Sequence, residues 1–154
     1  MFLLLCCLVA ADPEPQKNFK IEAEGSYPWT KHLGAKNLAI RNADELVAAS
    51  THALSRASNE VRRANATREL CAALKIKDID WNKQMVLVAS LGELSTGGYS
   101  ITISGAKLDK GVLKVSYKSK SPGPDEPVTQ AITYPSHVVL VPIHKGKIEF
   151  VQEK

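Results

Sequence analysis

The residues of this sequence that could carry out catalysis or bind a metal are scattered along the chain. The four histidines are His32, His52, His137 and His144, and none has another histidine, a cysteine or a carboxylate at the spacing of a metal-binding motif. Ser136 precedes His137, but neighbouring strand residues point to opposite faces and therefore do not form a catalytic pair. These patterns predict a protein with no metal site and no cofactor.

Motifs for nucleophilic and phosphate chemistry are also missing from the sequence. It has no Gly-x-Ser-x-Gly elbow and no glycine-rich phosphate loop before a helix. The carboxylate pairs Asp78/Asp80 and Asp125/Glu126 fall in loop-like segments, and distant carboxylates could still meet in space. Cys71 lies among apolar helix positions, which indicates a buried, inert thiol. We therefore expect a protein that is not an enzyme.

Composition and charge are typical of one globular domain. The 154 residues are 44% hydrophobic and 23% charged, and the net charge is +4. The basic residues are interspersed with acids. The densest basic segment, 56–68, contains Glu60 and has no aromatic residue for base stacking. This segment is typical of a solvated helix face or loop, and no nucleic-acid partner is predicted.

The first residues have the character of an export signal. Residues 1–11 are apolar and end in Val-Ala-Ala, which suits signal-peptide cleavage, although no positively charged residue precedes them. A bilayer span needs about 20 apolar residues, so this run is too short to be one. Residues 12–16 are predicted to be a linker. We expect an exported protein (periplasmic, cell-surface or secreted) in which Cys71 is the one remaining cysteine, so no internal disulfide forms.

The N-terminal half predicts strands followed by helices. Residues 18–24 alternate as a half-buried strand does, Tyr27-Pro28-Trp29 is typical of a turn, and residues 38–40 are a second short apolar segment. Asn42 and Glu45 form a capping-box pattern that begins a helix, with Leu46, Val47, Ala53 and Leu54 on one face. Residues 55–65 are predicted to be irregular, and residues 66–75 a second helix.

From Met85 the apolar period changes to two. Residues 85–91 are nearly all apolar, which is typical of a strand covered on both faces. Segments 99–103 and 113–117 alternate on either side of Asp109-Lys110-Gly111 and predict a hairpin. Further strands are expected at 128–134, 137–141 and 148–151. The fold class is α+β: a single domain over 17–154 with a mostly antiparallel, sandwich-like β region (84–152) and a helical insert of two short helices.

Two loops of this β region stand out. Between the first two strands lies Gly92-Glu93-Leu94-Ser95-Thr96-Gly97-Gly98-Tyr99, where the glycines are explained by a tight turn or bulge and the hydroxyl residues Ser95 and Thr96 are suited to contact a partner. The second loop, 121–127, contains three prolines. Its stiffness favours either docking on a partner at low entropic cost or a rigid connection.

The sequence resembles the C-terminal domain of the PrcB protease-complex subunit family from about residue 80 to the end. The resemblance is carried by three ordered motifs, namely Gly92–Ile101, Pro122–Ala131 and Tyr134–Pro142, and Trp81 with the strand after it also fits. It implies an exported, non-catalytic accessory protein that associates with and stabilises a secreted subtilisin-like protease. The expected partner-binding residues are Glu93, Ser95, Thr96, Gly97, Gly98, Tyr99, Pro124, Thr129 and Gln130.

A second resemblance starts from the same loop. Ser95-Thr96-Gly97-Gly98-Tyr99 is similar to the Asn-Pro-Thr-Thr-Gly-Tyr motif of chagasin-like cysteine-protease inhibitors, which have an immunoglobulin-like β fold. This chain lacks the Asn-Pro opening, contains an additional glycine and has no Arg-Pro-Trp segment. The alternative function is therefore a protease inhibitor that acts through the 93–99 loop.

Overall fold

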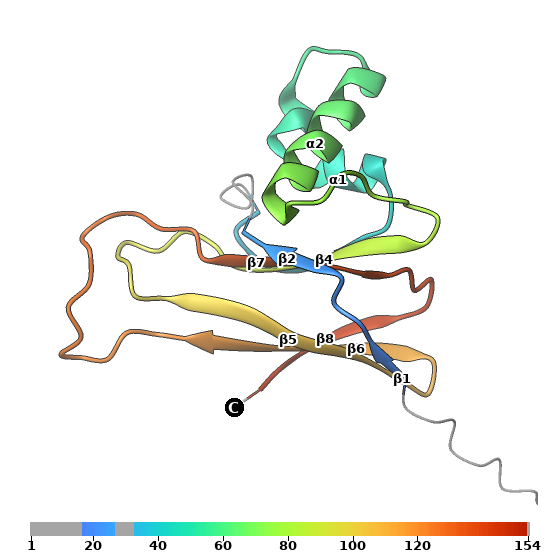
Figure 1. Ribbon diagram of the computed structural model, residues 1–154. Helices are drawn as coiled ribbons and strands as arrows, with labels where there is room; N and C mark the ends of the chain where they lie inside the picture. The colour runs from blue at the N-terminus through green and yellow to red at the C-terminus, as the bar shows by residue number, and fades with distance from the viewer. Residues whose placement is uncertain (1–16, 27–32, 154) are drawn as a thin grey trace, which may run out of the picture.

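The computed structural model describes residues 17–26 and 33–153. In this part of the chain, eight strands form two four-stranded sheets that lie face to face, and the helices cover the outer face of one sheet (Figure 1). The α+β class with mostly antiparallel sheets is confirmed. The predicted signal (1–11), linker (12–16), aromatic turn (27–29) and His32 lie outside the described residues.

The helix-covered sheet has the strand order β2 (Ala23–Gly25), β7 (Ser136–Pro142), β4 (Gln84–Leu91) and β3 (Ala35–Ile40), and every neighbouring pair is antiparallel. The central strands β4 and β7 are covered on both faces. Val86 and Val88 pack in the core under the helices, while Leu87 packs in the core between the sheets. This double burial explains why residues 85–91 carry an almost continuous apolar run.

The second sheet has the order β1 (Lys17–Phe19), β5 (Ser100–Asp109), β6 (Val112–Lys120) and β8 (Ile148–Gln152). The predicted hairpin between β5 and β6 is confirmed, with Lys110 and Gly111 both at positive φ (48° and 80°) in its turn. Two positive φ values suit the right-handed twist of the flanking strands. The β6–β8 pair is parallel, a minority arrangement within the mostly antiparallel fold.

The predicted single strand at 18–24 is wrong in one respect. The structure divides it into β1 and β2, which belong to different sheets, so the chain crosses from one sheet to the other at residues 20–22. Phe19 and Ile21 pack in the core between the sheets, whereas Ala23 packs under the helices. The residues do alternate, but their apolar side chains pack in two different cores.

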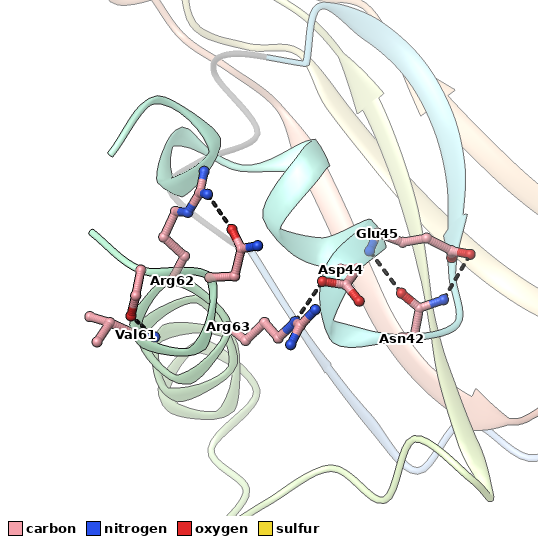
Figure 2. A network of polar contacts seen from close by, with 8 residues as sticks. Asn42, Asp44, Glu45, Val61, Arg62 and Arg63 are labelled. Carbon is pink, nitrogen blue, oxygen red and sulfur yellow. Dashed lines mark hydrogen bonds and ion pairs between the residues drawn. The ribbon is translucent and has the colours of Figure 1, made fainter. Parts of the chain in front are cut away.

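The first helix, α1 (Ala43–Ala49), begins at the predicted cap. Asn42 Oδ1 accepts a hydrogen bond from the Glu45 amide at 2.8 Å (Figure 2). Glu45 Oε2 accepts one from the Arg41 amide at 2.7 Å. The helix ends earlier than the apolar pattern predicts, because Ser50 terminates it and starts a 3₁₀ turn at Thr51–Leu54. Leu54 is 87% exposed, so its predicted place on the buried face is wrong.

The second helix, α2 (Asn59–Leu74), begins seven residues before the predicted start at residue 66. Ser58 caps it, and residues 59–65 include no buried residue; Ala66, Leu70, Cys71 and Leu74 form the buried stripe. Polar residues of 59–65 contact the rest of the helical layer, as Arg63 does by pairing with Asp44 of α1 (Figure 2). Apolar periodicity therefore marks only the part of α2 that lies over the sheet.

Cys71 is buried, as predicted, and it is a free thiol. Burial and the nearby charge of Asp78 raise the pKa of this thiol above its ordinary value. A raised pKa keeps the group protonated at neutral pH, and a thiol is a weak nucleophile compared with a thiolate. Cys71 thus acts as a small apolar side chain in the core under the helices.

Candidate protein-binding surface

Two long connections leave the same end of the sandwich. One joins β4 to β5 through residues 92–99, and the other joins β6 to β7 through residues 121–135; both extend beyond the strands on the left of Figure 1. We call these segments the paired loops. They contain all the residues that the sequence suggested for partner binding.

Backbone hydrogen bonds join the paired loops along their length. The Leu91 amide donates to the Pro135 carbonyl at 3.0 Å, Leu94 and Thr133 exchange bonds of 3.0 and 2.9 Å, and the Gly97 amide donates to the Thr129 carbonyl at 2.9 Å. These bonds continue the antiparallel pairing of β4 with β7 beyond the sheet. The predicted strand at 128–134 is nevertheless wrong, since Leu94–Thr133 is an isolated bridge and the segment is otherwise irregular.

Side chains strengthen the same pairing. The Thr133 hydroxyl donates to the Thr96 carbonyl at 2.7 Å, and the Tyr134 hydroxyl donates to Glu93 Oε2 at 2.9 Å. The hydrogen bond to Glu93, together with partial burial and the negative charge of that carboxylate, raises the pKa of Tyr134. Hydrogen bonds to a charged acceptor are stronger than neutral ones, which favours a fixed position for Glu93.

The two adjacent glycines of the first loop permit close contact with the second loop. A Cβ at position 97 would lie 2.3 Å from Thr129 Oγ1, and a Cβ at position 98 would lie 2.8 Å from Val128 Cγ1. Gly98 also has φ +85°, a conformation that other residues rarely adopt. The glycines therefore serve packing between the loops, and the turn explanation covers only part of their role.

The proline-containing part of the second loop has its own internal support. Glu126 Oε2 accepts a hydrogen bond from the Gly123 amide at 3.1 Å, and the Glu126 amide donates to the Gly123 carbonyl at 3.1 Å. Lys120 lies 3.3 Å from Glu126 Oε1. The Gly123 amide and the Lys120 ammonium both lower the pKa of Glu126. A turn is thus fixed at residues 123–126, with Pro124 exposed at its tip.

The structure brings the nine predicted contact residues together on one pair of loops, but it does not expose them equally. Gly97 is buried and its amide is used internally, while Thr96 and Tyr99 are half-buried. The exposed members of the set are Glu93, Ser95, Gly98, Pro124, Thr129 and Gln130. Sequence patterns did not single out Ile132, which is 60% exposed on the second loop. Ile132 could have been found as an apolar residue within a loop, but the predicted strand at 128–134 concealed this.

Pairs of ionisable residues do occur elsewhere in the described chain. His52 lies 3.1 Å from Glu69, and His137 lies 3.6 Å from Glu24. Sequence spacing could not reveal these pairs, because the partners are far apart in the chain. Within residues 17–26 and 33–153, no group of three or more histidine, cysteine, aspartate or glutamate side chains is placed to hold a metal ion. None of the helices described is long and apolar enough to cross a membrane.

A two-sheet sandwich with a helical layer and a pair of joined loops belongs to the class of scaffolds that present loops from a rigid framework. Residues 85–142 match the model of the PrcB C-terminal family, and this match confirms the resemblance over that segment. It covers less than half of the 154-residue chain and extends from β4 to the end of β7, so it includes both paired loops. Searches of the curated proteins and of the solved structures found no match.

Proposed function

We propose that this chain is an exported, non-catalytic accessory module that binds another protein through its paired loops. The observation that carries the proposal is the hydrogen-bonded union of residues 92–99 with residues 121–135, because both loops fall within the segment that matches the PrcB C-terminal family. Loops fixed on a rigid scaffold lose little entropy on binding. Through the family resemblance, the proposed partner is a secreted subtilisin-like protease that the module stabilises.

The surface offered to this partner is mainly polar with one apolar element. Ser95, Thr129 and Gln130 are exposed, Ile132 is exposed two positions after Gln130, and Glu93 adds a carboxylate. Polar groups around an apolar side chain are the usual composition of a protein–protein contact. The matched family is of the accessory type. Binding is the role that these features support.

The proposal is tested by recovery of the partner from the native host. The full chain with a C-terminal affinity tag is purified from the secreted fraction, and co-purifying proteins are identified by mass spectrometry. We expect a subtilisin-like protease, recovered at least about ten-fold less well with the double variant Ser95→Arg/Gln130→Arg, whose positions are exposed and make no side-chain hydrogen bond in the described structure. Ala72→Arg, an equally exposed change on α2, serves as the control.

Three outcomes would overturn parts of the proposal. Equal recovery of the partner by the double variant would remove the paired loops as the binding surface. Inhibition of a papain-like protease in solution, lost in the double variant, would replace the accessory role with the chagasin-like inhibitory role. Mass spectrometry of the purified chain also tests export, because removal of residues 1–11 is expected and their retention in a cell-associated chain would contradict it.

A further inference from the structure

The outer edge of β3 is the longest open edge among the sheets described. β3 has six residues and pairs with β4 on one side, and no described residue pairs with its other side. The other three edge strands are shorter, with three residues in β1, three in β2 and five in β8. An edge strand presents unpaired N–H and C=O groups, and short length is one way in which proteins protect such edges.

A groove runs beside this open edge. Its volume is about 450 Å³, and it lies between β3 and helix α1. The lining is partly apolar, through Leu33, Leu38, Ile40, Ala48 and Ala49, with Lys36, Arg41 and Glu45 as its charged residues. An open strand edge beside a groove closed by a helix offers both backbone hydrogen bonds and side-chain pockets to an extended peptide.

The register of β3 shows which side chains of a bound strand would enter the groove. Lys36, Leu38 and Ile40 occupy alternate positions and therefore share one face of the sheet. Ile40 and Leu38 pack in the core under the helices, so this is the face turned towards α1. A strand added to β3 would place alternate residues opposite these three side chains and would point them into the groove.

Charge distinguishes the two ends of this face. Lys36 is exposed, and no carboxylate in the described part of the chain lies within ion-pair distance of it. At the other end, the Arg41 guanidinium donates to the carbonyls of His144 and Gly146 at 3.0 and 3.1 Å. These two bonds hold the Arg41 side chain, and the Glu45 carboxylate lies at the same end of the groove, so that end carries charges of both signs. Lys36 is therefore the cation that a bound segment would face.

We propose that β3 binds an extended segment of another protein by strand addition. The segment carries a carboxylate opposite Lys36 and apolar side chains opposite Leu38 and Ile40, which gives the pattern acidic-x-apolar-x-apolar when it is read along β3. Opposite charges on directly facing residues stabilise a strand pair, and like charges destabilise it. A second copy of this chain fits less well, because β3 itself (Ala35–Ile40) contains no carboxylate that could face Lys36 of the other copy.

This inference does not depend on the proposed function of the paired loops. No residue of the groove lining belongs to residues 92–99 or 121–135. The accessory module would then have two binding surfaces, one built from loops and one from a strand edge. Failure of either test leaves the other surface unaffected.

The test uses the full chain and a random peptide library displayed on phage. We expect the enriched peptides to carry the acidic-x-apolar-x-apolar pattern as read along β3, which appears in reverse order in a peptide that binds antiparallel to β3. The best of them is then synthesised, and its Kd should be at least about ten-fold higher with Lys36→Glu or Ala48→Glu. Ala48 is exposed on α1 and lines the groove, so glutamate there narrows the groove and repels the acidic residue without disturbing the core. Methylation of alternate backbone amides of the peptide should also weaken binding, because these amides donate to β3.

Ala64→Glu is the matched control, since Ala64 is an exposed alanine on α2 outside this groove. The proposal is overturned if no peptide is enriched on the wild-type chain relative to Ala48→Glu, or if the enriched peptides bind the wild-type chain and Ala48→Glu equally. Sedimentation of the chain alone, without peptide, tests whether a second copy occupies the edge. A dimer that Ala48→Glu dissociates and Ala64→Glu does not would assign the edge to a second copy in place of a partner segment. Thermal unfolding of each variant confirms that it is folded.

Discussion

The amide of Gly97 donates a hydrogen bond to the carbonyl of Thr129 at 2.9 Å, and a Cβ at position 97 would lie 2.3 Å from the Thr129 hydroxyl oxygen. These two residues are more than thirty positions apart in the sequence and belong to different loops. Their contact joins two segments that carry separate family motifs into one surface. The proposed function therefore depends on whether this contact persists in solution.

Replacement of Gly97 by alanine should disrupt the paired loops. The added methyl group has no space beside Thr129, and overpacking of this kind costs roughly 1–3 kcal/mol. Urea unfolding measures the loss. Gly105→Ala is the control, because a Cβ there meets nothing within 4 Å. The double variant Gly97→Ala/Thr129→Ala should recover most of the loss, and purely additive effects would contradict a direct clash.

Glu93→Gln should lower the pKa of Tyr134 towards its ordinary value. The phenol donates to the Glu93 carboxylate, and this hydrogen bond is the largest cause of its raised pKa. Titration of the Tyr134 ring carbon by NMR measures the change in both proteins. Ser95→Ala, in the same loop, should leave the titration unchanged. An identical Tyr134 titration in the Glu93→Gln variant would show that the loops separate in solution.

His137 should make stability fall as the pH drops below the ordinary histidine pKa of about 6.5. Its Nδ1 accepts a hydrogen bond from the Ile103 amide at 3.0 Å, which links the two sheets and requires an unprotonated nitrogen. Burial lowers the pKa of His137 in the folded state, although the Glu24 carboxylate partly opposes this shift. The unfolded chain therefore binds more protons in this range. The stabilisation is fully present above the unfolded pKa of about 6.5 and is lost as pH falls through the lower folded pKa.

The measurement is the free energy of unfolding from pH 7.5 down to pH 5, in the wild type and in His137→Gln. Glutamine can accept the Ile103 hydrogen bond through its amide oxygen but does not titrate, so the variant should lose less stability across this range. Aspartates and glutamates with lowered pKa values, such as Asp109 and Glu126, contribute at more acidic pH in both proteins. Parallel curves for the two proteins would exclude His137 as the titrating group.

Asn42→Ala should destabilise the protein by about 1 kcal/mol through loss of the cap of α1. The Asn42 side chain accepts from the Glu45 amide, and an alanine leaves that donor without its partner (Figure 2). Thermal unfolding measures the change, and Asn42→Ser is the control, because it keeps an acceptor oxygen without placing a second carboxylate beside Glu45 Oε1. Equal losses in both variants would show that the side-chain acceptor is not what stabilises this end of the helix.

Some of these features could be predicted from local patterns in the sequence. The Asn42 cap, the doubly buried β4, the β5–β6 hairpin with its turn at Lys110-Gly111, and the α+β class all follow from residue types at short spacing. The physical reason is that caps, tight turns and alternating burial are determined by a few neighbouring residues. The family motifs were equally visible, because they are continuous segments.

Other features were decided only when distant segments met. Residues 18–24 alternate like one strand yet supply two sheets, and residues 128–134 have strand-like composition but pair with the other loop through an isolated bridge. Residues 59–65 of α2 are helical although none of them is buried, so no apolar stripe marks them in the sequence. The sequence by itself determined the cap of α1, the doubly buried strand β4, the β5–β6 hairpin and the two loop motifs of this protein. Only the tertiary structure joined Gly97 to Thr129 and left the edge of β3 open, because strand order and loop pairing depend on contacts between residues far apart in the chain.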